Sequence, residues 1–138
     1  MKNFQKNKTL ATFLASVSGG LGIHRFYLYG KKDHWGWLHL ASVPLSLLLM
    51  LLRPEQPVLF TAAPLVISAL SGFVEALVIG LTPDDKWDAR HNPNPNRPSQ
   101  SGWPLAILLV LTMGTGAIAV IATIARTFDL LYTGGAFG

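Results

Sequence analysis

The sequence predicts an all-α integral membrane protein with four hydrophobic helical segments. Only 13% of its 138 residues are charged, whereas soluble domains carry roughly 25%. Half of the residues are apolar, and they gather in long runs that short polar stretches separate. Cysteine is absent, which excludes disulfide bonds, thiolate catalysis and thiolate metal sites.

The first hydrophobic segment, residues 9–22, has the sequence TLATFLASVSGGLG and follows three lysines. A helix that crosses a bilayer needs ~20 mostly apolar residues, so this segment is short for a crossing. Its glycine-rich end also weakens a continuous helix. We therefore expect a short first segment that enters the membrane and returns to the same side, with a spanning helix as the alternative.

The second and third segments, residues 35–52 and 57–81, are longer and almost free of charge. Pro54 and Pro57 flank Glu55 between them and mark a tight turn. Two long apolar runs joined by such a turn predict a helical hairpin.

Further prolines and polar stretches divide the rest of the chain. Pro44 and Pro64 are expected to kink their helices, which a membrane bundle tolerates. Residues 92–102 are rich in proline, asparagine and serine, which predicts an extended, solvated linker. The predicted parts are a basic N-terminal segment (1–8), the first two segments with their loop (9–52), a third membrane helix (53–81), a charged and then Pro/Asn-rich loop (82–102), a fourth membrane helix (103–126) and a flexible tail (127–138).

Charge predicts how the chain sits in the membrane. Two crossings separate the loop at residues 24–34 from the loop at residues 82–102, so both loops lie on one side. They hold six lysines and arginines, against two, Arg53 and Arg126, on the opposite side. The positive-inside rule places the six in the cytoplasm, which predicts a multi-pass protein of the inner membrane. If the first segment returns, the three N-terminal lysines join the cytoplasmic side, and the count of lysines and arginines is nine against two. If it spans, they lie on the opposite side, and the count is six against five.

Four tryptophans flank these same two loops: Trp35, Trp37, Trp87 and Trp103. Indole side chains prefer the interface between membrane and water. Their distribution therefore supports a shared side for the two loops, and it predicts that all four rings contact the membrane surface.

The stretch GGLGIHRFYLYGKKDHWGWL resembles the signature of the TM-two domain family, whose members carry a pair of membrane helices. The match covers roughly residues 6–52, and the stretch EALVIGLTPDDKWDARHNP resembles the C-terminal part of longer bacterial members. Tyr29 is an insertion relative to the pattern, and the second segment lacks the family's glycine-rich middle. The resemblance implies a spanning first helix and no established activity. The matching positions are Lys8, Ala11, Ala15, Gly19, Gly22, His24, Arg25, Phe26, Tyr27 and Leu28.

Small residues recur every fourth position on several segments, a spacing that lets another helix backbone approach closely. We expect these rows to form contacts within the chain, with a contact between copies as the alternative. The row on the third segment consists of Ser68, Gly72, Ala76 and Gly80, and further rows are Ala11, Ala15 and Gly19 on the first segment and Thr115, Ala119 and Thr123 on the fourth.

Glu75 is the one charge in the third segment, and it lies ~9 Å from the helix end at 1.5 Å per residue. A carboxylate at this depth is costly unless it is partnered or protonated. Arg25 lies on the same side of the membrane, so we expect an ion pair between the two, with His24 as a second donor. In the alternative, Arg25 binds lipid phosphate and Glu75 is protonated or extends toward water.

The charged half of the loop, TPDDKWDAR, predicts a short helix. Thr82 or Asp84 is expected to cap its N-terminus, Trp87 to lie on the membrane, and Arg90 to close the last turn. With the HRFY residues this helix forms the predicted cytoplasmic surface. Its site residues are Asp84, Asp85, Trp87, Asp88 and Arg90.

The residues that carry chemistry do not form a known catalytic pattern. His34 and His39 are five positions apart and face different sides of a helix, and no phosphate loop, nucleophile elbow or zinc motif occurs. No basic helix with interleaved aromatic residues predicts nucleic-acid binding.

These patterns predict a small non-catalytic membrane protein without a cofactor or an identified small-molecule substrate. Its expected partners are the lipid bilayer and other membrane proteins or further copies of itself. The alternative is a homo-oligomeric channel or transporter with a polar pathway near Glu75, and an enzyme is a distant third possibility.

Overall fold

The computed structural model describes residues 4–138, so Lys2 of the basic N-terminal segment lies outside the described residues. About three quarters of the chain is helical, and the described residues form no strand. The elements in chain order are α1 (Lys8–Ser18), the 3₁₀ turn η1 (Gly19–Leu21), α2 (Ile23–Tyr29), α3 (His34–Leu52), α4 (Val58–Thr61), α5 (Ala63–Leu81), α6 (Asp84–His91) and α7 (Trp103–Tyr132).

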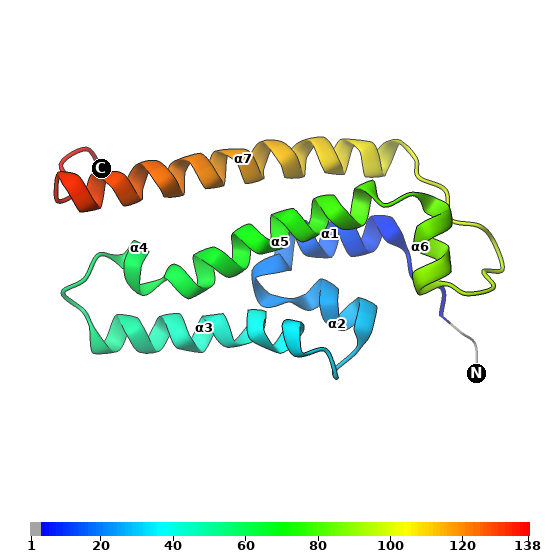
Figure 1. Ribbon diagram of the computed structural model, residues 1–138, viewed down its shortest axis with the longest axis horizontal. Helices are drawn as coiled ribbons and strands as arrows, with labels where there is room; N and C mark the ends of the chain where they lie inside the picture. The colour runs from blue at the N-terminus through cyan, green and yellow to red at the C-terminus, as the bar shows by residue number, and fades with distance from the viewer. Residues whose placement is uncertain (1–3) are drawn as a thin grey trace.

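Three of these helices, α3, α5 and α7, are long and apolar enough to cross a membrane. They run along the long axis of the molecule, and α5 packs against both of the others (Figure 1). The first hydrophobic segment is different, because α1 has 11 residues and extends only about 16 Å. Residues 4–138 therefore contain three helices of spanning length, and the first segment is short, as predicted.

The chain reverses direction after α1. Gly22 adopts φ +71°, and a Cβ atom there would lie 2.8 Å from the carbonyl oxygen of Gly36, so both conformation and space require glycine. As a result α2 returns to the end of the molecule at which α1 begins (Figure 1). Two contacts join the ends of this pair: Lys6 Nζ donates to the carbonyl oxygen of Leu28, and the Asn7 amide donates to Tyr27 Oη over 2.9 Å.

The predicted hairpin of the second and third segments is present as α3 and α5, which lie antiparallel with residues 53–62 between them (Figure 1). The third segment is interrupted, because α4 ends at Thr61 and α5 begins at Ala63. Pro64 therefore lies in the first turn of α5, where a proline is tolerated, and the helix predicted over this segment is broken just before it rather than kinked within α5. The amide of Leu65, free in this first turn, donates to Ser46 Oγ of α3 over 3.1 Å.

The rows of small residues on the first and third segments pack against each other within the chain, as predicted. The α5 row, Ser68, Gly72, Ala76 and Gly80, is buried. A Cβ atom on Gly19 would lie 2.5 Å from the Cα atom of Gly72, which shows how closely the two backbones approach. On α7 the buried residues are instead Leu105, Thr112 and Gly116, so the row predicted at Thr115, Ala119 and Thr123 does not form this contact.

The fourth segment is longer than predicted, because α7 continues to Tyr132 and includes the first half of the expected flexible tail. Asp129 makes contacts that hold the end of this longer helix. It pairs with Arg126 one turn earlier, and its Oδ1 accepts the amide of Phe137 over 3.2 Å, so the residues after the helix fold back onto its end.

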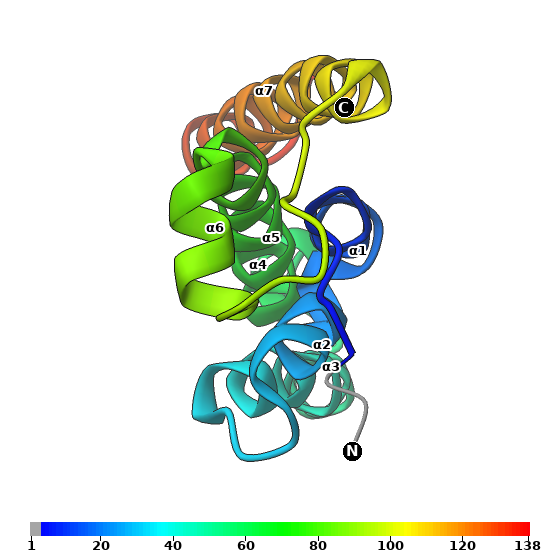
Figure 2. The same ribbon diagram turned by 90° about the vertical axis from the view of Figure 1, so that its right-hand side faces the viewer.

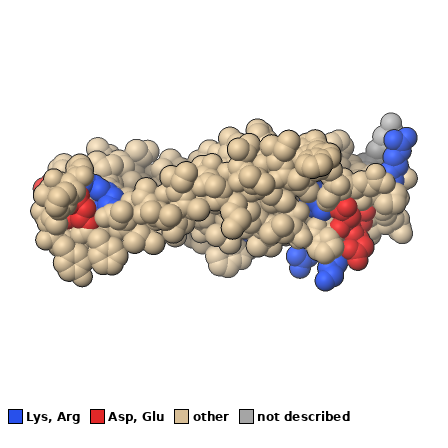
Figure 3. Space-filling model, turned by 90° about the horizontal axis from the view of Figure 1, so that it is seen from above, with Lys and Arg blue, Asp and Glu red and all other residues tan. Residues whose placement is uncertain are grey.

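Charged side chains gather at the two ends of the molecule on the face seen in Figure 3, and the middle of that face is uncharged. In α3, α5 and residues 103–125 of α7, Glu75 is the one aspartate, glutamate, lysine or arginine. α6 lies across the end of the bundle at which the chain begins, and residues 92–102 lead from it to α7 (Figure 2). Length, apolarity and this distribution of charge together indicate a multi-pass membrane protein.

Candidate functional site

Glu75 is the centre of a polar cluster between α2, α3 and α5. Its Oε2 accepts hydrogen bonds from Arg25 Nη1 over 2.8 Å and from His24 Nε2 over 2.7 Å, and its Oε1 lies 3.1 Å from His39 Nε2. The predicted contact between Arg25 and Glu75 is confirmed. His24 binds together with Arg25 rather than in its place, and His39 adds a third hydrogen-bond partner that sequence reasoning did not assign.

Arg25 connects this cluster to the start of α3. Its guanidinium binds Asp33 with two nitrogens, at 2.7 Å and 3.3 Å, and lies 5.3 Å from the ring centre of Tyr29. Asp33 also accepts the amide of Gly36 over 2.7 Å and so caps the N-terminus of α3. The Arg25 guanidinium holds the pKa of the Asp33 carboxyl below its ordinary value. Burial lowers the pKa of Arg25, but the bonds to Asp33 and Glu75 outweigh it and raise the pKa.

The hydrogen bonds of His39 require an additional proton in the cluster. Ser68 Oγ donates to the carbonyl oxygen of Gly20 over 2.7 Å, so its single hydrogen is used there. His39 Nδ1, 2.6 Å from Ser68 Oγ, must then be the donor to it. A hydrogen bond between His39 Nε2 and Glu75 Oε1 therefore needs a second proton, which either His39 or Glu75 carries.

His24 is fully buried, and its Nδ1 has no hydrogen-bond partner in the described part of the chain. Because Nε2 donates to Glu75, a neutral ring leaves Nδ1 as a bare acceptor, which costs less than an unpaired N–H on a buried cation. The ring lies edge-on to His39, with 6.0 Å between ring centres. His24 thus ties the turn after Gly22 directly to α5.

Lys8 and Asp84 form a second connection at the end of the bundle. The two side chains are paired, and Lys8 Nζ also donates to the carbonyl oxygen of Thr82 over 2.8 Å. Asp84 further accepts the amide of Ser101 over 2.8 Å. Burial raises the pKa of Asp84, but the bonds from Lys8 and Ser101 outweigh it and hold the pKa below its ordinary value.

α6 differs from its prediction in three respects. Trp87 is 1% exposed and packs with Ala11 and Leu28, so it is buried in the protein and does not lie on the membrane. The N-cap position is Pro83, which offers no side-chain acceptor, and neither Thr82 nor Asp84 caps the helix. Arg90 does not close the last turn, because the amide of Asn92 does so by donating to the carbonyl oxygen of Asp88.

The segment after α6 is irregular and mostly exposed, in agreement with the solvated linker that its composition predicted, but hydrogen bonds also hold it to the helix. Asp88 accepts the amide of Ser99 over 2.7 Å and the hydroxyl of the same serine over 2.6 Å. Burial raises the pKa of Asp88, but the bonds from Ser99 and Asn92 hold it below its ordinary value. A buried carboxylate therefore organises residues 92–102.

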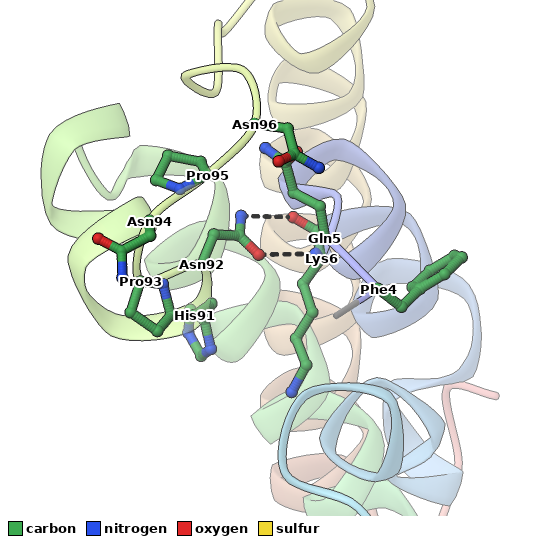
Figure 4. A pocket seen from close by; sticks show the side chains of 9 residues that line it. All are labelled: Phe4, Gln5, Lys6, His91, Asn92, Pro93, Asn94, Pro95 and Asn96. Carbon is green, nitrogen blue, oxygen red and sulfur yellow. Dashed lines mark hydrogen bonds between the residues drawn. The ribbon is translucent and has the colours of Figure 1, made fainter. Parts of the chain in front are cut away.

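Asn92 joins this segment to the N-terminal residues. Its side-chain amide accepts from the Lys6 amide over 2.7 Å and donates to the Lys6 carbonyl over 3.0 Å, beside an open hollow of about 790 Å³ (Figure 4). The two bonds satisfy a backbone amide group that no helix pairs. Lys6, Lys8, Asp88 and Asn92 thus dock the start of the chain against α6.

The described residues contain no group of three histidines, aspartates or glutamates arranged to hold a metal ion. Comparisons with protein-family models, with curated proteins and with solved structures gave no match. Fold and site therefore define a class, a multi-pass helical membrane protein with a polar cluster at Glu75. The resemblance to the TM-two domain family stays a prediction.

Proposed function

We propose that the protein is a non-catalytic accessory or interaction subunit of the bacterial inner membrane. One observation carries the proposal. The carboxylate of Glu75 is bound by Arg25, His24 and His39 of its own chain, so the cluster acts as an internal clamp. Its donors are used to hold helices together, which leaves the outer helix faces and the α6 end to contact other molecules.

Two observations support a re-entrant first segment. α1 is too short to cross, and Lys6, which precedes it, contacts Leu28 at the end of α2. We place the N-terminus, the HRFY residues and α6 together in the cytoplasm, in agreement with the count of basic residues. A family relationship to TM-two domain proteins is compatible with this sequence pattern, although that family pattern implies a spanning first helix.

The outer part of α7 is the surface that we assign to a partner. None of residues 117–132 is buried, so this half of the helix packs little against its own chain. Its exposed side chains are large and apolar, among them Ile118, Ile121 and Ile124. Because lipid tails are as apolar as these side chains, a partner helix on this face is held by close packing rather than by the hydrophobic effect.

Photo-crosslinking in native membranes tests this assignment. A benzoylphenylalanine at Ile121 is expected to give a discrete protein–protein product. The matched control is the same substitution at Leu47 of α3, which is also exposed but lies on a helix that packs along its length. Products of equal yield at both positions, or at neither, contradict the assignment of α7.

The alternative function is a homo-oligomeric channel or transporter. The feature in its favour is the additional proton that the chain of Glu75, His39 and Ser68 requires, because buried carboxylates and histidines form proton relays in transporters. Proton flux into liposomes that contain the purified protein, abolished by Glu75→Gln, favours the alternative. Absence of flux above that of empty liposomes favours the accessory function.

A further inference from the structure

A pocket of about 450 Å³ opens between α2, α5 and α6, next to the Glu75 cluster. Two kinds of wall meet in it. One is basic and is formed by Arg25, Lys86 and Arg90, and the other is apolar and includes Val78 of α5. A pocket that is cationic on one side and apolar on the other matches an amphipathic ligand with a negatively charged headgroup.

The charges in this pocket are not balanced within the protein. Arg25 is already paired with Asp33 and Glu75, and the carboxylate of Glu75 is already bound by its own donors. Lys86 and Arg90, one turn apart on α6, are exposed and have no acidic partner within 4.0 Å in residues 4–138. Two positive charges therefore remain available at its rim, about one helical turn from each other.

The apolar wall continues along the outside of α5. Val74, Val78 and Leu81 are largely exposed and follow one face of the helix away from α6. Trp103, at the start of α7 near the same end of the bundle, is 82% exposed and suits the level of the headgroups. A molecule with its head at α6 thus has a continuous apolar surface for its tail.

We propose that this pocket binds the phosphate group of an anionic phospholipid. Lys86 and Arg90 donate to the phosphate oxygens, and an acyl chain follows Val78 and Val74 along α5. Basic pockets between membrane helices recognise lipid headgroups in this way. A free phosphate ion shares the headgroup chemistry but does not use the apolar wall. The site rests on the membrane placement of the helices and is independent of the partner assigned to α7.

Binding of phosphatidylglycerol to the full-length, delipidated protein in non-ionic detergent, measured by native mass spectrometry, tests the proposal. Each cation near a headgroup contributes about fivefold in affinity, so the double variant Lys86→Gln/Arg90→Gln is expected to bind roughly 30-fold more weakly. Each single variant is expected to lose about fivefold. The matched control, Lys31→Gln/Lys32→Gln, removes two exposed cations that do not line the pocket, and it is expected to change affinity by about twofold or less.

Several outcomes overturn the proposal. Equal losses in the double variant and in the control indicate general surface attraction. Equal affinity for phosphatidylglycerol and phosphatidylcholine indicates that the negative headgroup is not recognised. Displacement of the lipid by millimolar inorganic phosphate assigns the pocket to the free ion. A double variant that fails to fold leaves the two single variants, whose unchanged affinity also refutes the site.

Discussion

Replacing Glu75 by alanine is expected to cost about 2–4 kcal/mol of the free energy of unfolding. Removing one partner of a buried ion pair costs about 3–5 kcal/mol, and we lower this range because the Glu75 side chain is 28% exposed. The loss has a clear origin. His24, fully buried, is left with neither ring nitrogen paired, while Arg25 keeps only Asp33. Glu75→Gln retains an acceptor and is expected to cost less, about 1–2 kcal/mol.

A double-mutant cycle isolates the ion pair. Equilibrium unfolding in mixed micelles, followed by circular dichroism, gives the free energies for Arg25→Ala, Glu75→Ala and the double variant. We expect a coupling energy of about 1–2 kcal/mol. The matched control is the cycle on Arg53 and Glu55, a pair at 3.7 Å whose side chains are 67% and 57% exposed. Exposed pairs contribute at most about 1 kcal/mol, and we expect a coupling below about 0.5 kcal/mol there. Additive effects at Arg25 and Glu75 refute the clamp.

Three further predictions concern packing and pH. Gly19→Ala places a methyl group 2.5 Å from a backbone atom of α5 and is expected to lower the free energy of unfolding by about 1–3 kcal/mol in the same assay. As a control, the methyl group of Gly114→Ala enters open space, and this variant is expected to be neutral or stabilising. Trp87→Ala removes a buried ring and is expected to cost about 3 kcal/mol, with rapid proteolysis near α6 as a second readout. The pKa of Asp88 is lowered in the folded state, so its contribution to the free energy of unfolding is present above its ordinary pKa of 3.8 and is lost as pH falls below that value. Hydrogen exchange at the Ser99 amide, which Asp88 accepts, is therefore expected to accelerate at low pH. An exchange rate that does not depend on pH, after correction for the intrinsic rate, contradicts this hydrogen bond.

Much of this fold is visible in the sequence because its strongest signals are local. Long apolar runs predict the helices, and the turn at Pro54 and Pro57 predicts the hairpin of α3 and α5. The pair of Arg25 and Glu75 was also predictable, because a lone carboxylate in an apolar helix needs a partner on its own side of the membrane. These inferences require only chain order, helix rise and the cost of an unpaired charge.

The rest of the cluster depends on contacts between distant parts of the chain. His39 is one of many polar residues near this end, and only the packing of α3 on α5 brings it to Glu75. Asp33 does carry a local signal, since an aspartate directly before an apolar run is a common helix cap. Local composition also misled: Trp87 resembles an interfacial tryptophan, but docking of α6 over α1 and α2 buries it.

The central claim is that the first segment enters the bundle and returns, so that the chain begins on the side of α6. Because the protein has no cysteine, single-cysteine variants report the side of each position without background labelling. Phe4→Cys and Asp85→Cys, both at exposed positions, are compared with Gln56→Cys in the turn between α3 and α4, using a membrane-impermeant maleimide on intact cells and on inverted membrane vesicles. The account predicts that Phe4→Cys and Asp85→Cys are labelled only in inverted vesicles and Gln56→Cys only in intact cells. Labelling of Phe4→Cys from the same side as Gln56→Cys contradicts it, because α1 then crosses the membrane.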